Sequence, residues 1–398
     1  MEFAEKSNMT DNMKKSFIDV IYKYEVWKKL KKKILLVGAF PKYQSGGIFG
    51  GQLTACKLLA ESELRNKYHL LFIDSTSISI PPPHFLIRGI FALFRLFKFT
   101  FKVRITNPEV IIIFFAGFSS TLEKSVMLII GKLFNKKIMI FPRAGALISH
   151  YHKNIIFNLY VKKTLSLANK FLCQGKNFQD FAISQLNFKK TDCPIIPNWT
   201  ATDSFLELGI NKKVSCEKEI TNLVFIGWIE EFKGIYEIIR ASLILKERGK
   251  KFHIYFCGDG NGMKDLEKLI KKYGLDKSAT LLGWIDGRDK INILKNADIF
   301  ILPSWNEGLP NSMIEAMSSG LACIVSDVGA ISNYIKHEEN GLLIKPKCPD
   351  ELASSIIKLI DDKILLKKIS RNSFDFAMKN FTIKKAEEIF EREIESLS

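Results

Sequence analysis

The chain has 398 residues, of which 47% are hydrophobic and 25% are charged. This composition is that of a globular protein and excludes a disordered chain, and the length exceeds what one hydrophobic core usually holds, so we expect two domains. Seven scattered cysteines without a C-x-x-C pair argue against a disulfide scaffold or a zinc site and favour a reducing compartment.

The positive charge is concentrated in the first half of the chain. The whole chain carries +17, but residues 1–200, with 30 Lys/Arg and 12 Asp/Glu, carry +18, whereas residues 201–398 carry −1. A basic domain beside a neutral one predicts an anionic partner, either nucleic acid or acidic lipid. Because no nucleic-acid-binding motif is present, we do not expect nucleic acid to be the partner.

Short apolar runs alternate with helical stretches along most of the chain. In the first half the predicted strands are Lys33–Phe40, His69–Asp74, Val110–Ala116, Lys137–Phe141 and Lys170–Cys173. In the second half they are Leu223–Gly227, His253–Cys257, Thr280–Leu282, Ile299–Leu302, Ala322–Ser326 and Leu342–Ile344. This alternation predicts an α/β fold with two facing Rossmann-like domains, each built on a parallel sheet, and a ligand-binding cleft between them.

The domain limits follow from breaks in this rhythm. Residues 1–32 are predicted to be an extension that is helical or poorly ordered, and residues 33–195 the N-terminal domain. A polar, proline-containing stretch predicts a linker over 196–219, and residues 220–370 are predicted to form the second domain. Residues 371–398 are expected to be helical and to pack back on the N-terminal domain.

The segment Leu86–Val103 predicts a helix with an unusually wide apolar face. At about 100° per residue, Arg88, Arg95, Lys98 and Lys102 share one narrow sector, and phenylalanines and leucines fill most of the rest. We expect this helix to lie on an anionic membrane with the basic strip beside its aromatic residues. The alternative is an ordinary helix whose wide face packs in the core. No signal pattern occurs near the start and no apolar run is long enough to span a bilayer, so the expected location is cytoplasmic, at the inner face of the plasma membrane.

Two motifs in the second half place polar groups after strands. Lys233 and Gly234 lie just past a strand, where an ammonium and free N–H groups suit a phosphate. After the strand Ile299–Leu302, Glu307 lies in a loop, Pro310 and Asn311 open a helix, and Glu315 follows on that helix. Two carboxylates flanking a helix N-terminus suit a sugar hydroxyl and a ribose as ligands.

From Leu223 to about Asn372 the chain resembles the retaining GT-B glycosyltransferases of family 4. The motif G-R-x-x-x-x-K-G is nearly present over Gly227–Gly234, and the motif E-x7-E is complete as Glu307 and Glu315. In the first half only the pair Gly46-Gly47 after the first strand gives a clear match. The resemblance implies transfer, with retention, of a hexose-type sugar from a nucleoside-diphosphate sugar to a lipid-linked or glycan acceptor, as in the biosynthesis of bacterial surface polysaccharide.

The resemblance also implies roles for individual residues. Lys233 would neutralise the donor diphosphate, Glu307 would bind the transferred sugar as a catalytic residue, and Glu315 would hold the ribose. Gly46 and Gly47 would let the N-terminal loop approach the phosphate. The remaining predicted donor-binding residues are Gly227, Trp228, Trp284, Ile285, Gly308, Leu309, Pro310, Asn311 and Ser312, of which Trp284 and Ile285 would hold the base.

One departure from the family pattern concerns the leaving group. The usual arginine of G-R-x-x-x-x-K-G is Trp228 here, and Arg143, after an N-terminal strand, is the candidate catalytic substitute; a surface or capping arginine is the alternative. This departure keeps open a nucleotide-sugar-binding protein that has lost catalysis, and the fold keeps open a nucleotide-sugar 2-epimerase. The run Gly258–Gly262 lacks dinucleotide-binding spacing, and no P-loop or D-x-D motif occurs, so we expect no cofactor and no metal.

Overall fold

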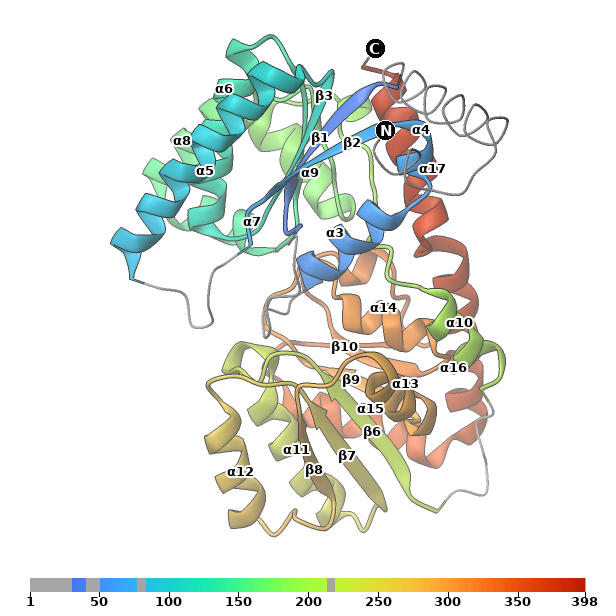
Figure 1. Ribbon diagram of the computed structural model, residues 1–398. Helices are drawn as coiled ribbons and strands as arrows, with labels where there is room; N and C mark the ends of the chain where they lie inside the picture. Colours follow the sequence, from blue (N-terminus) through green and yellow to red (C-terminus); the bar gives the residue numbers. More distant parts are fainter. Residues whose placement is uncertain (1–30, 41–50, 77–83, 213–218, 398) are drawn as a thin grey trace, which may run out of the picture.

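The computed structural model describes residues 31–40, 51–76, 84–212 and 219–397, which form two lobes (Figure 1). The upper lobe is built on a five-stranded sheet of order β2-β1-β3-β4-β5 and the lower lobe on a six-stranded sheet of order β11-β10-β9-β6-β7-β8. Every pairing within these two sheets is parallel. The prediction of two Rossmann-like α/β domains is confirmed.

The strands lie close to the predicted apolar runs. In the N-terminal domain they are β1 (Lys33–Gly38), β2 (His69–Asp74), β3 (Val110–Phe115), β4 (Lys137–Pro142) and β5 (Lys170–Phe171). In the C-terminal domain they are β6 (Thr221–Ile226), β7 (Phe252–Cys257), β8 (Ala279–Gly283), β9 (Ile299–Leu302), β10 (Ala322–Ser326) and β11 (Leu342–Ile344). Central strands such as β3 and β9 are buried at every position because helices cover both faces of each sheet.

Helices fill the connections between the strands. Those of the first half are α3 (Gly51–Glu61), α4 (Leu64–Lys67), α5 (Phe85–Thr106), α6 (Phe118–Leu133), α7 (Ala146–Lys153), α8 (Ile155–Leu165), α9 (Lys176–Leu186) and the short 3-10 helix η1 (Lys190–Asp192). Those of the second half are α10 (Asp203–Ile210), η2 (Glu231–Lys233), α11 (Ile235–Glu247), α12 (Met263–Lys272), α13 (Gly287–Asn296), α14 (Asn311–Ser318), η3 (Ile331–Asn333), α15 (Pro349–Asp361), α16 (Lys363–Asn380) and α17 (Ile383–Glu395).

The two faces of the N-terminal sheet are covered by different parts of the chain. Along β1, Leu35 and Val37 point to a core shared with α5, α6, α8 and α9, whereas Ile34 and Leu36 point to the opposite core. That second core contains α3 and, from the end of the chain, Phe390 of α17. Figure 1 shows α17 beside α4 in the upper lobe, although α16 before it lies in the lower lobe. The last helix therefore completes the N-terminal domain.

The chain crosses between the lobes at two adjacent points. Ile196 and Trp199, which the predicted limits assign to the linker, are buried in the N-terminal core, and Ala201 is buried in the C-terminal core. The amide of Ala201 donates a hydrogen bond to the carbonyl of Phe381 (3.1 Å), where the chain returns to the upper lobe. The first crossing therefore lies between Trp199 and Ala201.

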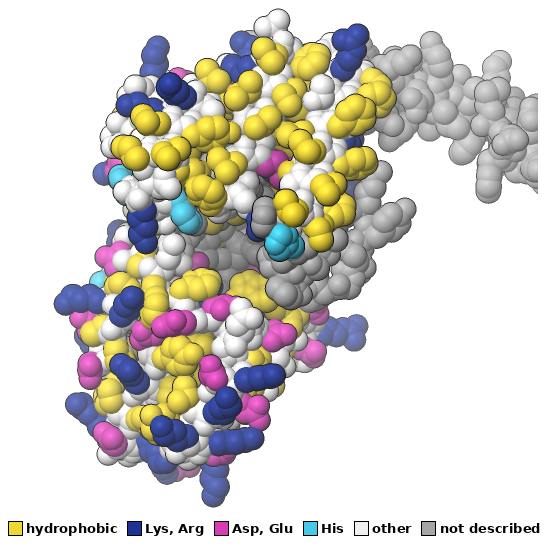
Figure 2. Space-filling view, turned by 90° about the vertical axis from the view of Figure 1, so that its left-hand side faces the viewer, with side chains coloured by type: hydrophobic (Ala, Val, Ile, Leu, Met, Phe, Trp, Pro, Cys, Tyr) yellow, Lys and Arg dark blue, Asp and Glu magenta, His cyan; other side chains and the backbone are white. Residues whose placement is uncertain are grey.

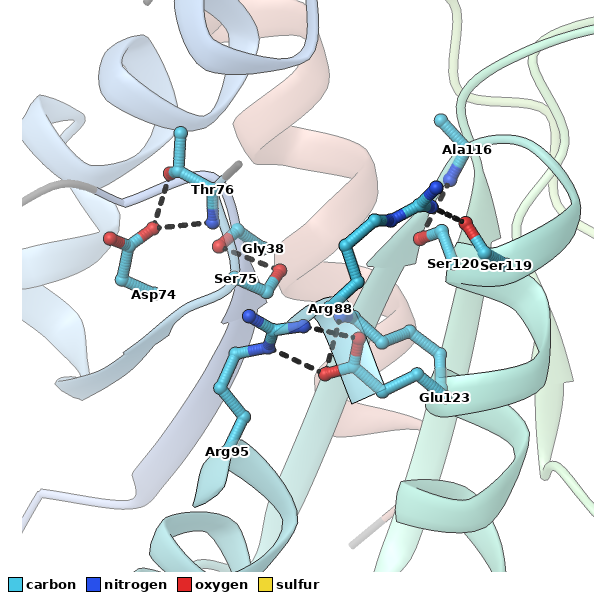
Figure 3. A network of polar contacts seen from close by, with 11 residues as sticks. Gly38, Asp74, Ser75, Thr76, Arg88, Arg95, Ala116, Ser119, Ser120 and Glu123 are labelled. Carbon is cyan, nitrogen blue, oxygen red and sulfur yellow. Dashed lines mark hydrogen bonds and ion pairs between the residues drawn. The ribbon is translucent and has the colours of Figure 1, made fainter. Parts of the chain in front are cut away.

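The helix predicted over Leu86–Val103 forms as α5, but of its four predicted basic residues only Arg88 and Lys98 are exposed. Arg95 donates two hydrogen bonds to the carboxylate of Glu123 (2.7 and 2.8 Å), and Lys102 donates one to the carbonyl of Phe72 (2.9 Å). Arg88 hydrogen-bonds to a hydroxyl of α6 (Figure 3). The expected basic strip on the outer surface is thus wrong for Arg95 and Lys102, because α6 and the β2 edge offer acceptors that draw them inward, whereas Arg88 stays exposed at the start of the helix.

The outer side of α5 consists of phenylalanine, leucine and isoleucine instead, and these side chains give the upper lobe the apolar surface seen in Figure 2. The alternative prediction, a wide apolar face buried in the core, applies only to a narrow side of the helix that includes Phe99 and Val103. Within the described ranges, none of the helices combines the length and the apolar character needed to cross a membrane.

Candidate active site

A cavity of about 410 Å³ lies between the two lobes, at the carboxyl ends of the strands of both sheets. This is the position at which parallel α/β sheets bind ligands. The N-terminal domain contributes the start of α3, Ala116 after β3, and Arg143 to Gly145 after β4. The C-terminal domain contributes the loops after β6, β7, β8 and β9 and the start of α14.

The cavity brings together the predicted site residues that the structure describes. Its lining includes Arg143, Gly227, Trp228, Lys233, Trp284, Ile285, Glu307, Gly308, Leu309, Pro310, Asn311, Ser312 and Glu315. Gly46 and Gly47 lie outside the described residues. Motifs separated by up to 172 positions in the sequence therefore meet around one space.

Lys233 and Glu307 form an ion pair on the floor of the cavity. The distance from Lys233 Nζ to Glu307 Oε1 is 2.5 Å, and both side chains are largely buried. Lys233 ends the turn η2, and the next residue, Gly234, has a φ of +79°. A Cβ at Gly234 would lie 2.2 Å from the carbonyl oxygen of Pro303, so only glycine lets the lysine loop pack against the β9 loop.

Glu315 lies on α14 with its side chain nearly buried, and it pairs with Lys290 of α13 at 3.2 Å. Lys290 also lines the cavity. It is a site residue that the sequence analysis missed, because nothing in the α13 sequence distinguishes it from an ordinary surface lysine. Only the fold shows that this part of α13 borders the cavity.

Arg143 reaches the cavity from the N-terminal domain. Its guanidinium contacts the rings of Phe141 and Trp199, 4.7 Å from each ring centroid. The Nη1 atom is buried, and no described residue accepts a hydrogen bond from it. Burial lowers the pKa of Arg143 to about 10, so the group still carries its charge at neutral pH. A buried cation with donor capacity to spare beside a cavity is suited to an anionic ligand.

Two tryptophans stand on the opposite side. The rings of Trp228 and Trp284 are 5.5 Å apart between centroids and inclined by 44°, and both residues line the cavity. Trp228, at the position of the usual arginine, thus contributes an aromatic surface instead of a charge. Such a surface suits stacking with a planar ring or with the C–H face of a sugar.

A second residue missed by the sequence analysis, Asn198, connects the two domains beside the cavity. Its amide donates to the carbonyl of Leu309 and to Oδ1 of Asn311, both at 2.6 Å, and accepts a hydrogen bond from Gln174. Asn311 in turn donates to the carbonyl of Gly51 at the start of α3 (2.7 Å). The predicted donor-binding loop is therefore fastened to the N-terminal domain by side-chain amides.

No three His, Cys, Asp or Glu side chains gather as a metal ligand set anywhere in the described ranges. The charged groups that the cavity does contain are two lysines, an arginine and two glutamates. These side chains are suited to holding a diphosphate and hydroxyl groups.

Two facing Rossmann-like domains with the site in the cleft between them define the GT-B fold, the architecture of a large class of glycosyltransferases. Residues 210–376 match the family described as "Glycosyl transferases group 1". An uncharacterised glycosyltransferase of Methanocaldococcus jannaschii is 29% identical over 318 residues, which cover 75% of this chain and 77% of that protein. The chain is therefore a glycosyltransferase of GT-B fold.

A second relative is named for an enzyme of the same class, and a solved structure shares the fold. The Escherichia coli UDP-Gal:alpha-D-GlcNAc-diphosphoundecaprenol alpha-1,3-galactosyltransferase is 30% identical over 225 residues, which cover 54% of this chain and 57% of that enzyme. The crystal structure of Anabaena HepE in complex with UDP is similar with a TM-score of 0.67 at 16% identity, and the match covers 92% of this chain and all of that one. At that identity the likeness concerns the fold alone.

Proposed function

We propose that the protein transfers a hexose-type sugar, with retention of configuration, from a nucleoside-diphosphate sugar to a lipid-linked or glycan acceptor in the biosynthesis of bacterial surface polysaccharide. The observation that carries this proposal is the gathering of Lys233, Arg143, Glu307 and Glu315 around one cavity between the domains. Two supports come from similar proteins, because the Escherichia coli relative is named for a UDP-galactose donor and a diphosphoundecaprenol-linked acceptor, and the Anabaena structure contains UDP.

The charges in the cavity suit a donor diphosphate. Lys233 reaches it from the C-terminal domain and Arg143 from the N-terminal domain, so a diphosphate between them meets two cations from opposite sides. Together with the amides of residues 309–312, they would stabilise the charge that develops on the leaving diphosphate. In this proposal Arg143 takes over the task of the arginine that Trp228 replaces, and neither a metal nor another cofactor is required.

The glutamates suit the two sugars of the donor. Glu315 would bind the ribose hydroxyls, and Trp228, Trp284 and Ile285 would surround the base end. Glu307 is held by Lys233 in the loop just before α14, and we assign it to a hydroxyl of the transferred sugar. The bond between the anomeric carbon and the phosphate oxygen breaks as the acceptor hydroxyl attacks from the same face, and the leaving phosphate takes the acceptor's proton.

The stereochemical outcome tests this mechanism. A thermal-shift screen of nucleotide sugars identifies the donor first, because a ligand at 100 times its Kd adds roughly 2.7 kcal/mol to the stability. Transfer with that donor and a membrane extract should give a product whose NMR coupling at the anomeric centre matches that of the donor, also in the presence of EDTA. The variant Glu307→Gln should keep part of the transfer. An inverted product, or a glycosyl adduct on Glu307 in the intact-protein mass, contradicts the mechanism.

The same assay separates the enzyme from a binding protein without catalysis, which Trp228 alone would suggest. A protein of that kind would show the thermal shift with a nucleotide sugar but no turnover of it. A 2-epimerase would convert the donor without any acceptor and would leave the acceptor unmodified. We expect consumption of the donor to depend on the acceptor.

We further propose that the enzyme works at the cytoplasmic face of an anionic membrane. Supports for this are the +18 charge of residues 1–200 and the apolar outer side of α5. Since the basic residues Arg95 and Lys102 contact the protein itself, attachment through α5 would rest mainly on its apolar side chains.

A further inference from the structure

A broad apolar surface covers one side of the N-terminal domain. We define the apolar face by nine side chains of α5 and α8 that are between 54% and 77% exposed: Leu86, Ile90, Leu93, Phe94, Phe97, Phe101, Ile155, Ile156 and Leu159. The helix α6 packs against both α5 and α8 and joins the two rows. Figure 2 shows this side of the upper lobe as largely hydrophobic. Contiguous surfaces of this kind mark contact with a membrane or another apolar partner.

Charged groups adjoin the apolar face in a way that favours a membrane over an apolar protein partner. Lys162 and Lys163 are exposed in the last turn of α8, which also carries Leu159. At the other end of the face, Arg88 is exposed in the first turn of α5. Apolar side chains next to cations are complementary to a lipid layer with anionic groups at its surface.

Arg88 differs from Arg95, which lies two turns further along α5. Arg95 is neutralised by the bidentate contact with Glu123, whose carboxylate also lies 3.3 Å from the buried Lys124. Burial alone would raise the pKa of Glu123, but Arg95 and Lys124 together hold it below the usual range, so this cluster is internally compensated. Arg88 instead donates to the neutral hydroxyl of Ser119 at 2.5 Å, and among the described residues no carboxylate pairs with it.

A short chain of contacts links Arg88 to the donor cavity (Figure 3). Ser119 and Ser120 begin α6, and the Oγ of Ser120 accepts a hydrogen bond from the amide of Ala116 at 3.3 Å. Ala116 lines the cavity from the end of β3. Arg88 and Ser119 therefore lie where the apolar face meets the cleft, between a membrane-like surface and the donor site.

We propose that Arg88 and Ser119 bind the diphosphate of a lipid-linked acceptor whose hydrocarbon chain lies along the apolar face. The acceptor sugar would then extend past Ala116 into the cavity. On the protein, the apolar face is followed by Arg88 and Ser119 and then by the donor cavity. This order matches that of the hydrocarbon, the diphosphate and the sugar in a lipid diphosphate sugar. This inference rests on the proposed function for the acceptor sugar, but the binding of a lipid diphosphate at Arg88 can be tested without transfer.

The test uses farnesyl diphosphate as a soluble lipid diphosphate and calorimetry on the full chain. The variant Arg88→Gln should weaken its binding at least about tenfold, because one charge-assisted contact to phosphate is lost, and Arg88→Lys should restore part of the affinity. The matched control Arg104→Gln changes an exposed arginine of the same helix, roughly 24 Å along its axis, and should bind normally. The nucleoside diphosphate of the donor, added in excess to fill the cavity, should leave this binding unchanged; a loss there with none in Arg88→Gln would place the ligand in the donor cavity and overturn the proposal.

Vesicles distinguish the acceptor diphosphate from lipid head groups as the anion that Arg88 binds. In flotation with phosphatidylcholine vesicles, with and without phosphatidylglycerol, Arg88→Gln should behave like the parent. If it instead loses binding to the phosphatidylglycerol vesicles by the factor seen with farnesyl diphosphate, Arg88 binds membrane head groups and the inference is wrong. Melting temperatures of the variants identify any that fail to fold, and Arg88→Lys then provides the comparison.

Failure of the inference differs from failure of the proposed function. Arg88-dependent binding of farnesyl diphosphate without any sugar transfer would leave the site standing and refute the transferase. If sugar is transferred to a lipid-linked acceptor and the acceptor KM is the same in the parent and in Arg88→Gln, the transferase is supported and the Arg88 site is refuted. A rise of the acceptor KM in Arg88→Gln, with the donor KM unchanged, supports both.

Discussion

At the scale of single residues, Glu315 offers a direct test of how the donor is oriented. Its side chain is nearly buried on α14 and faces Lys290 at 3.2 Å, so the carboxylate is fixed in place before a ligand arrives. If it accepts hydrogen bonds from the ribose, Glu315→Ala should weaken binding of a nucleoside diphosphate roughly tenfold or more, since a hydrogen bond to a charged group is worth about 1.5–3 kcal/mol.

Calorimetry with the nucleoside diphosphate of the donor and with its 2′,3′-dideoxy analogue checks this assignment. The parent should prefer the compound with both hydroxyls, whereas Glu315→Ala should bind both compounds equally weakly. Glu267→Ala, which changes an exposed glutamate on α12, is the matched control. If Glu315→Ala binds the nucleoside diphosphate as tightly as the parent does, Glu315 does not bind the ribose.

Arg143 combines a cost to folding with a gain for catalysis. A pKa of about 10 in place of 12.5 means that burial disfavours the charged form, a penalty on the order of 3 kcal/mol below pH 10 that the two aromatic contacts partly offset. Arg143→Met should therefore not lower the melting temperature. It should lower kcat by about 10²-fold or more if the guanidinium stabilises the leaving diphosphate.

The two measurements together separate a catalytic arginine from a structural one. A structural arginine held by Phe141 and Trp199 would show the reverse pattern, a lower melting temperature with nearly normal turnover. Such a result would mean that Arg143 does not take over the role of the arginine that Trp228 replaces.

At the scale of secondary-structure elements, the strands were predictable and the orientation of α5 was not. The runs Ile299–Leu302, Ala322–Ser326 and Leu342–Ile344 have their predicted bounds, because a strand of a parallel sheet is buried on both faces and its sequence is continuously apolar. For α5, the periodicity of the sequence separated an apolar side from a basic side, but it did not show which of the two packs against the rest of the domain. That depended on Glu123, which lies 28 residues along the chain from Arg95 and draws Arg95 inward.

The same limit explains which site residues were found. Glu307 and Glu315 belong to one contiguous motif, so their meeting in the cavity needs only local structure. Lys290 and Asn198 become site residues only through packing between distant elements, and neither has a distinctive sequence context. Arg143 was identified because it follows a strand at the end that faces the cleft.

The inward orientation of α5 carries its own prediction. Arg95→Gln should destabilise the protein by about 3–5 kcal/mol, because it leaves the nearly buried Glu123 without its bidentate partner. Thermal unfolding measures this, and Lys98→Gln, which changes an exposed lysine of the same helix, is the control. If both variants melt like the parent, Arg95 is a surface residue, as the sequence alone had suggested.

The pH dependence of this cluster has a definite sign. The folded-state pKa of Glu123 lies below its ordinary value, so its pairing stabilises the protein fully above about pH 4.5, and that stability is lost as the pH falls through the folded-state pKa. Arg95→Gln should therefore be closer in stability to the parent in acid than at neutral pH.

At the scale of the whole molecule, the chain's last helix ties the two domains together. The helix α17 covers one face of the N-terminal sheet, with Phe390 and Ile394 in its core, and it follows directly on α16 of the C-terminal domain. The cavity needs both domains, since Arg143 belongs to one and Lys233 to the other. A change that loosens α17 should therefore affect the site even though α17 contributes no residue to its lining.

Lys170 of β5 and Glu393 of α17 form the ion pair best suited to test this attachment. They lie 2.6 Å apart, and each side chain is only 7% exposed. Breaking one side of such a pair leaves a buried charge, so Glu393→Leu should cost about 3–5 kcal/mol, whereas replacing both members by apolar residues is often close to neutral. We expect the double variant Lys170→Met/Glu393→Leu to recover most of the stability lost in Glu393→Leu, as measured by urea unfolding.

The kcat of the double variant should stay near that of the parent, because α17 remains docked on the sheet. The single variant Glu393→Leu should lose turnover at the temperature at which α17 detaches. If the double variant is as unstable as the single one, the attachment depends on the specific charges, and the apolar contacts of Phe390 and Ile394 do not suffice to hold the helix.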